Sequence, residues 1–153
     1  MKKIVMSANL YAVNDLRYEQ TSVADCGKDE VVVEIKSCGI CGSDISRVYT
    51  KGTYHFPTII GHEFSGVVVY DPQNELSGKK VAVFPLLPCF ECESCKSGNY
   101  ATCENYDYYG SRRDGGMSEI ICVKRWNVLV MPDNLVLMKV QCASRSLLQD
   151  MPF

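Results

Sequence analysis

Four cysteines fall within the fifteen-residue run CFECESCKSGNYATC, and this cluster constrains the fold of the chain more than any other feature. Gaps of two, two and seven residues separate them, and Gly98 and Asn99 supply a turn that returns the fourth cysteine to the other three. Four soft sulfur ligands with no open position are typical of a tetrahedral structural zinc site. An iron–sulfur cluster uses the same ligands, and unmetallated thiols are a further alternative. We predict a structural zinc ion bound by Cys89, Cys92, Cys95 and Cys103.

The overall charge of the chain excludes some classes of partner. Its 153 residues carry a formal net charge of −2 with scattered basic residues, so it lacks the basic face of a nucleic-acid or membrane-surface binder. No apolar run approaches the roughly 20 residues that span a bilayer, and the N-terminus lacks the apolar core of a signal peptide. We therefore expect a cytoplasmic protein, with no nucleic acid and no membrane as partner.

The expected compartment also predicts the state of the nine cysteines. Cytoplasmic thiols stay reduced, so we expect metal sites and free thiols rather than disulfides. Cys26, Cys122 and Cys142 have no partner at short spacing, and we predict that all three are reduced thiols.

Short runs of β-branched residues, separated by turn formers, predict a mostly β (α+β) fold. In residues 30–38 the alternation places Val31, Val33 and Ile35 on one face of a half-buried strand. Further strands are expected in the runs SGVVVY, KKVAVFPL, MSEIICVKR and NVLVMP. A short helix is expected to start at Ser43 or Asp44. Several short strands with little helical periodicity favour an antiparallel barrel over a sandwich.

A second group of potential metal ligands lies upstream, in SCGICGSD and GHEFSG. Taken alone, Cys38 and Cys41 could form a redox-active pair. His62 could equally be an ordinary core histidine beside a solvated Glu63. The residues themselves leave these alternatives open.

The order of CGICGSD, GHEFSG, the four-cysteine run and DGGMSE resembles the zinc-containing medium-chain dehydrogenase/reductase family over about residues 1–135. Within that family, FPLLPCFECESC and YYGSRRDGGMSEIICVKR look most like the polyol and polyol-phosphate dehydrogenases. The resemblance implies a GroES-like β-barrel catalytic domain in residues 1–136, with the zinc lobe at 89–103, followed by a Rossmann cofactor domain. Cys38 matches no ligand position of the family and is interpreted as a buried structural thiol.

The resemblance also implies a catalytic zinc ion, and hence two zinc ions per chain. Cys41 and His62 would bind it, with Glu63 as a direct or water-mediated partner. The zinc ion would act as a Lewis acid on an alcohol whose hydride passes to NAD. Asp44 would orient His62, and Ser43 would start a proton relay to solvent. Alternatively, Ser43 and Asp44 only cap the helix.

Three further residues are candidates for substrate binding. Arg112 and Arg113 could hold the phosphate of a sugar-alcohol phosphate through bidentate hydrogen bonds, or they could belong to a solvated turn. His55 could line the substrate pocket or relay a proton, or it could be an exposed loop residue. Gly115 and Gly116 are expected to form a tight turn with positive φ angles.

The sequence departs from the family after MPDNL, where it continues as VLMKVQCASRSLLQDMPF. No glutamate follows Glu119, and no G-x-G-x-x-G motif occurs, so the distal zinc ligand and the Rossmann domain are missing from these residues. NAD is therefore not expected to bind this chain. A frameshift or early stop in a longer gene is our hypothesis for this departure. We expect residues 137–153 to form a weak helix or to be disordered.

Three classes of function follow from this reading. The first is the zinc-binding catalytic domain of an NAD-dependent polyol dehydrogenase, which acts on a polyol or polyol phosphate if a cofactor domain is supplied and is inactive alone. The second is a non-catalytic domain stabilised by zinc. The third is a zinc-ribbon module for nucleic acid, which the acidic balance argues against. The sequence indicates no particular oligomeric state.

Overall fold

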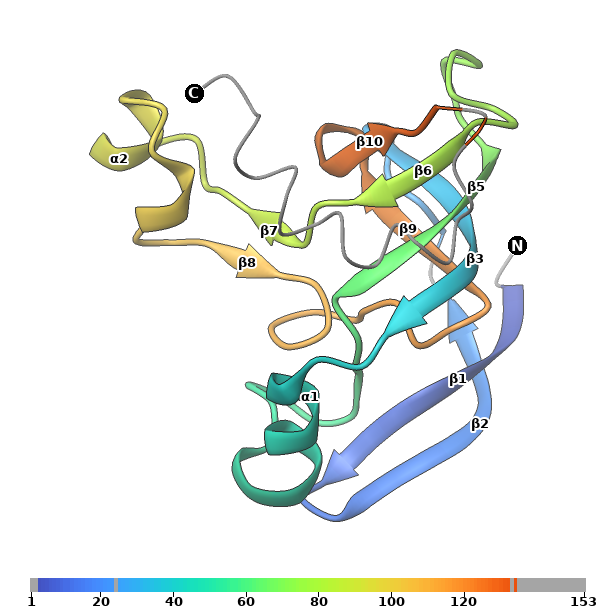
Figure 1. Cartoon of the computed structure of the whole chain (residues 1–153), viewed down its shortest axis with the longest axis vertical. Coiled ribbons are helices and arrows are strands. Elements are labelled where there is room, and N and C mark those ends of the chain that lie inside the picture. The colour runs from blue at the N-terminus through green and yellow to red at the C-terminus, as the bar shows by residue number, and fades with distance from the viewer. Residues whose placement is uncertain (1–2, 24, 133, 135–153) are drawn as a thin grey trace.

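The computed structural model describes residues 3–23, 25–132 and 134, most of them in short strands (Figure 1). The elements in chain order are β1 (Lys3–Ala12), β2 (Asp15–Val23), β3 (Glu30–Gly39), α1 (Gly42–Ser46), the π-helical turn η1 (Arg47–Lys51), β4 (Thr58–Ile59), β5 (Glu63–Tyr70), β6 (Lys80–Val83), β7 (Leu86–Leu87), α2 (Glu93–Lys96), the 3₁₀ turn η2 (Tyr100–Thr102), β8 (Asp107–Tyr108), β9 (Ile120–Lys124), the 3₁₀ turn η3 (Arg125–Asn127) and β10 (Val128–Val130). Among these residues no helix is long and apolar enough to cross a membrane. Cys142 and the expected tail at 137–153 lie outside the described residues.

The largest sheet has five antiparallel strands in the order β10-β6-β5-β3-β9, and in Figure 1 it curls into half of a barrel. A three-stranded sheet, β2-β1-β4, continues the wall, because Ala8 N–H donates to Met117 O (2.8 Å) and Glu119 N–H donates to Met6 O (3.1 Å). The small ladder β7-β8 leads from the barrel to α2. The prediction of a mostly β, barrel-like fold is confirmed.

The core fills the concave side of the five-stranded sheet. Val31 and Val33 of β3 are fully buried, as the alternation predicted, and they pack with Phe64 and Tyr109. Each such side chain contributes about 1.5–3 kcal/mol through burial. Tyr109 also has a polar role, because its hydroxyl accepts a hydrogen bond from Lys124 N–H (2.9 Å). The core is thus closed over the sheet by a residue from the loop that follows β8.

The β1–β2 hairpin was not predicted. Its two strands pair from Lys3 opposite Val23 to Ala12 opposite Asp15, and Asn14 forms the turn with a φ of 66°. Ser7 and Asn9 are buried within it and bond to each other and to Thr21, rather than presenting apolar side chains. The apolar alternation that marks a half-buried strand is therefore interrupted by polar residues on the buried face.

The expected short helix is present. It begins at Gly42, one residue before the predicted start, and continues through η1 to Gly52, whose φ of 75° ends it. Asp44 accepts a hydrogen bond from Cys41 N–H on Oδ2 (3.0 Å), as expected of a capping residue. The turn of the β1–β2 hairpin packs on this segment, because Asn14 N–H donates to Val48 O (2.7 Å).

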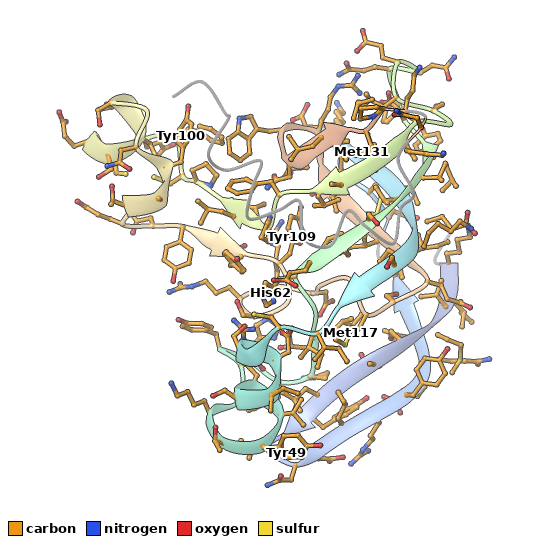
Figure 2. The ribbon with its side chains drawn as sticks, viewed as in Figure 1. Tyr49, His62, Tyr100, Tyr109, Met117 and Met131 are labelled. Atoms are coloured by element: carbon orange, nitrogen blue, oxygen red, sulfur yellow. A yellow bond between two sulfur atoms is a disulfide. The ribbon has the colours of Figure 1, made fainter. Side chains whose placement is uncertain are left out.

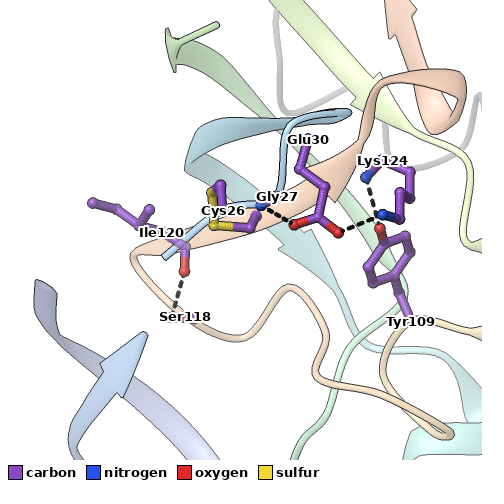
Figure 3. The surroundings of a disulfide bond; sticks show 8 residues. Cys26, Gly27, Glu30, Tyr109, Ser118, Ile120 and Lys124 are labelled. Carbon is purple, nitrogen blue, oxygen red and sulfur yellow. Dashed lines mark hydrogen bonds and ion pairs between the residues drawn. A yellow bond between two sulfur atoms is a disulfide. The ribbon is translucent and has the colours of Figure 1, made fainter. Parts of the chain in front are cut away.

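Cys26 and Cys122 form a disulfide, so the prediction that both are reduced thiols is wrong (Figure 3). Their Cα atoms lie 5.5 Å apart although 96 residues separate them in the chain. The register explains the contact, because Cys122 of β9 pairs with Val32 of β3 and Cys26 lies in the segment that leads into β3. Only strand pairing brings the two thiols together, and short-range spacing cannot reveal it.

The expectation of positive φ angles at Gly115 and Gly116 is also wrong, since the glycines with positive φ lie elsewhere, Gly61 and Gly110 among them. Close approach of the backbone is what requires glycine here. A Cβ on Gly115 would lie 2.1 Å from Gly61 O, and one on Gly116 would lie 2.4 Å from the ring of Phe64. The glycine pair therefore lets residues 115–116 pack directly against the segment that enters β5.

Candidate metal centres

The four-cysteine lobe, residues 89–103, stands apart from the half-barrel in Figure 1. The four sulfur atoms all lie within 4.8 Å of one another, with Cys89 Sγ 3.9 Å from Cys95 Sγ and Cys92 Sγ 4.0 Å from Cys103 Sγ. A tetrahedral ion with metal–sulfur bonds of about 2.3 Å needs sulfur–sulfur separations of about 3.8 Å. The four thiols could therefore hold a zinc ion with little movement.

Backbone N–H groups in the lobe point at the sulfur atoms. Glu91 and Cys92 donate to Cys89 Sγ at 3.5 and 3.4 Å, and these bonds lower the pKa of Cys89 to about 6. Burial raises the pKa of Cys95 to about 12. A metal ion bound by the four cysteines would displace the protons that their thiols still carry.

An aromatic cluster joins the lobe to the sheet. Trp126 of η3 packs edge-on against Phe90 and Tyr100 of the lobe, with ring centroids 5.1 and 5.5 Å apart, and against Phe84 at 5.9 Å. Such pairs contribute roughly 0.5–1.5 kcal/mol each beyond burial of their area. Because Trp126 is the single tryptophan of the chain, its environment depends directly on how the lobe is seated.

The second group of potential ligands is Cys41, His62 and Glu63, whose ligand atoms also lie within 4.8 Å of one another. Cys41 immediately precedes α1, His62 immediately precedes β5 and Glu63 is the first residue of β5, so the group forms where the helix meets the barrel. Figure 2 shows His62 at this junction. The structure thus brings together the motifs CGICGSD and GHEFSG, as the resemblance implied.

Asp44 is the buried carboxylate behind His62. Its Oδ1 lies 3.2 Å from Nδ1 of His62 and accepts a hydrogen bond from Arg47 Nη1 at 3.0 Å. Burial would lower the pKa of His62, but the hydrogen bond to Asp44 and the charge of Asp44 outweigh it and raise the pKa. Conversely, burial would raise the pKa of Asp44, but the bond to His62 keeps it low. With Nδ1 engaged in this way, Nε2 is the ring nitrogen left to bind a metal ion.

The two cysteines of the C-x2-C pair have opposite character. Hydrogen bonds from Ser43, with a smaller contribution from His62, lower the pKa of Cys41. Burial, reinforced by Asp44 and Glu63, raises the pKa of Cys38 to about 12. Both thiols are free rather than joined. Cys41 is therefore suited to metal binding, and Cys38 is a partly buried thiol that packs against the core.

The remaining predicted residues lie outside this group of ligands. His55 is exposed, and its Nε2 lies 3.0 Å from the carbonyl oxygen of Arg112. The Arg112 guanidinium packs against the rings of Tyr54 and Tyr106, at 4.2 and 4.4 Å from their centroids, and its buried Nε has no hydrogen-bond partner among the described residues. Arg113 donates to Asp107 through Nε (2.8 Å). The assignment of His55, Arg112 and Arg113 to the substrate stays a prediction.

Two residues near the centre were missed by the sequence analysis. Arg47 bonds to Ser43 Oγ (2.9 Å) as well as to Asp44. Arg47 lies four residues after Ser43 and three after Asp44, a spacing that predicts these contacts on a helix. The ring of Tyr108 lies 5.8 Å from that of His62, a contact that no local pattern predicts.

Residues 27–133 match the model of the alcohol dehydrogenase GroES-like domain. The chain belongs to this family. The GroES-like fold expected from the motifs is thereby confirmed, and the curled sheet of Figure 1 is the domain's half-barrel. Among curated relatives, galactitol 1-phosphate 5-dehydrogenase of Escherichia coli K12 is 48% identical over 111 residues, which cover 71% of this chain and 32% of the relative.

Solved structures support the same membership in the GroES-like family. The crystal structure of galactitol-1-phosphate dehydrogenase from Escherichia coli superposes with a TM-score of 0.81 at 39% identity, covering 92% of this chain and 41% of that one. A structure described as a short chain alcohol dehydrogenase of Escherichia coli CFT073, complexed with NADH, gives a TM-score of 0.83 at 30% identity, covering 90% and 41%. The chain spans about a third of the length of the first curated relative.

Proposed function

We propose that this chain is the zinc-binding catalytic part of an NAD-dependent dehydrogenase that acts on a polyol or polyol phosphate. The observation that carries the proposal is the convergence of Cys41, His62 and Glu63 within 4.8 Å, with Asp44 on the far side of the histidine ring. The 48% identity to a galactitol 1-phosphate 5-dehydrogenase supports this class of substrate.

The donor set fits zinc. A thiolate, an imidazole and a carboxylate are all ligands of zinc, and three protein ligands leave a coordination position open, as catalytic zinc sites require. A zinc ion held there would act as a Lewis acid toward a substrate hydroxyl. Asp44 would keep the proton of His62 on Nδ1, so that Nε2 faces the metal.

Ser43 is placed to move the proton of the substrate hydroxyl. Its Oγ accepts a hydrogen bond from Arg47 Nη1 and its O–H is hydrogen-bonded to Cys41, which leaves one lone pair for a further bond. It also lines a cavity beside α1. We propose that Ser43 accepts the proton on its free lone pair and passes its own proton toward solvent once its O–H has turned from Cys41 to the cavity.

NAD would accept the hydride in this reaction. These 153 residues contain no G-x-G-x-x-G sequence, so we propose that NAD is bound by residues beyond them. The chain alone, mixed with galactitol 1-phosphate and NAD, should then form no NADH. Turnover by the isolated chain would contradict this part of the proposal.

Metal counting tests the main proposal. We expect two zinc ions per chain by elemental analysis, one in the lobe and one at Cys41, and a single zinc ion in Cys41→Ser. Cys38→Ser is the matched control, because it removes a neighbouring thiol that is not in the ligand group and should leave both ions in place. A single zinc ion in the unmodified chain, unchanged by Cys41→Ser, would favour the alternative function, a non-catalytic domain stabilised by the lobe.

A further inference from the structure

A cavity of about 430 Å³ lies beside α1 and η1, and its size falls in the range of small-molecule sites. Its wall is formed by cationic and hydroxyl side chains with one glycine. They are Ser43, Ser46, Arg47, Lys51, Gly52, Thr53 and Tyr54. No carboxylate is among these lining residues, so the cavity presents hydrogen-bond donors and positive charge.

The two cations of the cavity are only partly neutralised. Arg47 bonds to Asp44 and Ser43 through Nη1 alone, and no described residue accepts a hydrogen bond from its Nε or Nη2. Lys51 is exposed and has no carboxylate within ion-pair distance in the described part of the chain. The cavity is therefore lined by one unpaired lysine and by an arginine with two unengaged nitrogen atoms, a combination suited to a phosphate group.

The cavity adjoins the proposed catalytic centre. Ser43 lines the cavity and hydrogen-bonds to Cys41, while Asp44 joins Arg47 on the cavity side to His62 on the metal side. Ser43 and the Asp44–Arg47 pair thus lie between the cavity and the group formed by Cys41, His62 and Glu63.

We propose that Arg47 and Lys51 bind the phosphate of a polyol phosphate and give this site its preference for phosphorylated over unphosphorylated polyols. This inference rests on the proposed dehydrogenase function for the identity of the ligand. The cavity itself is defined independently of the metal site.

The guanidinium groups suggested by the sequence are less available for this task. Asp107 pairs with Arg113, and the Arg112 guanidinium packs against the rings of Tyr54 and Tyr106. One of these rings, Tyr54, also lines the cavity. Arg112 therefore supports the wall of the phosphate cavity from behind.

The test measures binding of four ligands to the zinc-loaded chain by calorimetry or NMR titration. The ligands are galactitol 1-phosphate, galactitol, inorganic phosphate and NAD. Lys51→Gln removes the unpaired charge without touching the Asp44–His62 contact, and Lys28→Gln, near the start of β3, removes an equal charge away from the cavity. Arg47→Met is measured with its zinc content, which reports any disturbance of Asp44.

We expect Lys51→Gln to weaken the binding of galactitol 1-phosphate and of inorganic phosphate by about tenfold, which corresponds to the loss of a charge-assisted hydrogen bond. The affinity for galactitol should not change. Lys28→Gln should change none of the affinities. Equal phosphate affinity in Lys51→Gln and the unmodified chain would overturn the proposal. So would a loss confined to NAD, which would assign the cavity to the dinucleotide pyrophosphate.

A further arm separates this proposal from the proposed function. In Cys41→Ser, which lacks the second metal ion, inorganic phosphate should still bind and should still depend on Lys51. If the unmodified chain holds a single zinc ion and does not bind galactitol but still binds phosphate, the proposed anion site stands and the proposed dehydrogenase function is contradicted. If the chain holds two zinc ions but does not bind phosphate, only the proposed anion site is contradicted.

Discussion

Asp44 and His62 lie 18 residues apart in the sequence, yet Oδ1 of the carboxylate is 3.2 Å from Nδ1 of the ring. The same buried carboxylate accepts hydrogen bonds from Cys41 N–H and from Arg47. It therefore caps the helix, orients a potential metal ligand and holds one cation of the phosphate cavity. The contact expected of a capping residue and the contact with His62 occur together, and the orientation of His62 toward a metal ion stays a prediction.

The first prediction concerns Asp44→Asn. The pKa of Asp44 lies below its usual 3.8 and that of His62 above its usual 6.5. In the metal-free chain, the stabilisation by ionised Asp44 is present above pH 3.8 and is lost as the pH falls through the lowered pKa of Asp44. The stabilisation by protonated His62 is complete below pH 6.5 and is lost as the pH rises through the raised pKa of His62. Urea unfolding should therefore show the largest cost of Asp44→Asn, about 1.5–3 kcal/mol, between these limits.

Asp107→Asn is the matched control for this prediction. It also removes a carboxylate paired with an arginine, but Asp107 and Arg113 are more than a third exposed, so the cost should stay below about 1 kcal/mol. A cost of Asp44→Asn that is small and independent of pH would show that the contact with His62 does not stabilise the fold.

The second prediction uses Trp126 as a reporter of the lobe. Removing metal with a chelator, or replacing a ligand in Cys95→Ser, should unseat Phe90 and Tyr100 and shift the tryptophan emission. Zinc content should fall by one ion in Cys95→Ser, while Cys41→Ser should lose an ion without altering the emission. Unchanged emission after loss of the lobe's metal would mean that the aromatic contacts hold the lobe without it.

Much of the fold and the four-cysteine group could be predicted from local patterns, whereas the group of Cys41, His62 and Glu63 was implied by the family resemblance. The alternation around Val31 and Val33 marks a strand with one buried face, and the four-cysteine spacing places its ligands within one lobe whatever surrounds it. Contacts set by tertiary pairing could not be predicted in this way. Cys122 of β9 and Cys26 in the segment before β3 are brought together only by the strand register. The β1–β2 hairpin was missed because it buries polar residues such as Asn9, which interrupt the apolar alternation.

The third prediction concerns that disulfide. The double variant Cys26→Ser/Cys122→Ser should lower the free energy of unfolding by about 2–4 kcal/mol, because the crosslink restricts the unfolded chain over 96 residues. Figure 3 shows neighbouring contacts that the variant keeps, among them the Glu30–Lys124 ion pair (3.1 Å). Thiol titration of denatured, unreduced protein gives the direct check. Two additional reactive thiols in that assay would show that the bond does not form in solution.

The fourth prediction links backbone packing to metal binding through Gly115→Ala. The new Cβ would lie 2.1 Å from Gly61 O, so the segment that carries His62 must move. Overpacking of this kind costs about 1–3 kcal/mol. We expect lower stability and loss of the zinc ion at Cys41 and His62, with the lobe's zinc retained. Gly42→Ala is the control, since a Cβ there meets nothing within 4 Å and should be neutral or stabilising by up to about 1 kcal/mol. Two zinc ions in Gly115→Ala would show that the entry to β5 tolerates displacement without loss of the metal site.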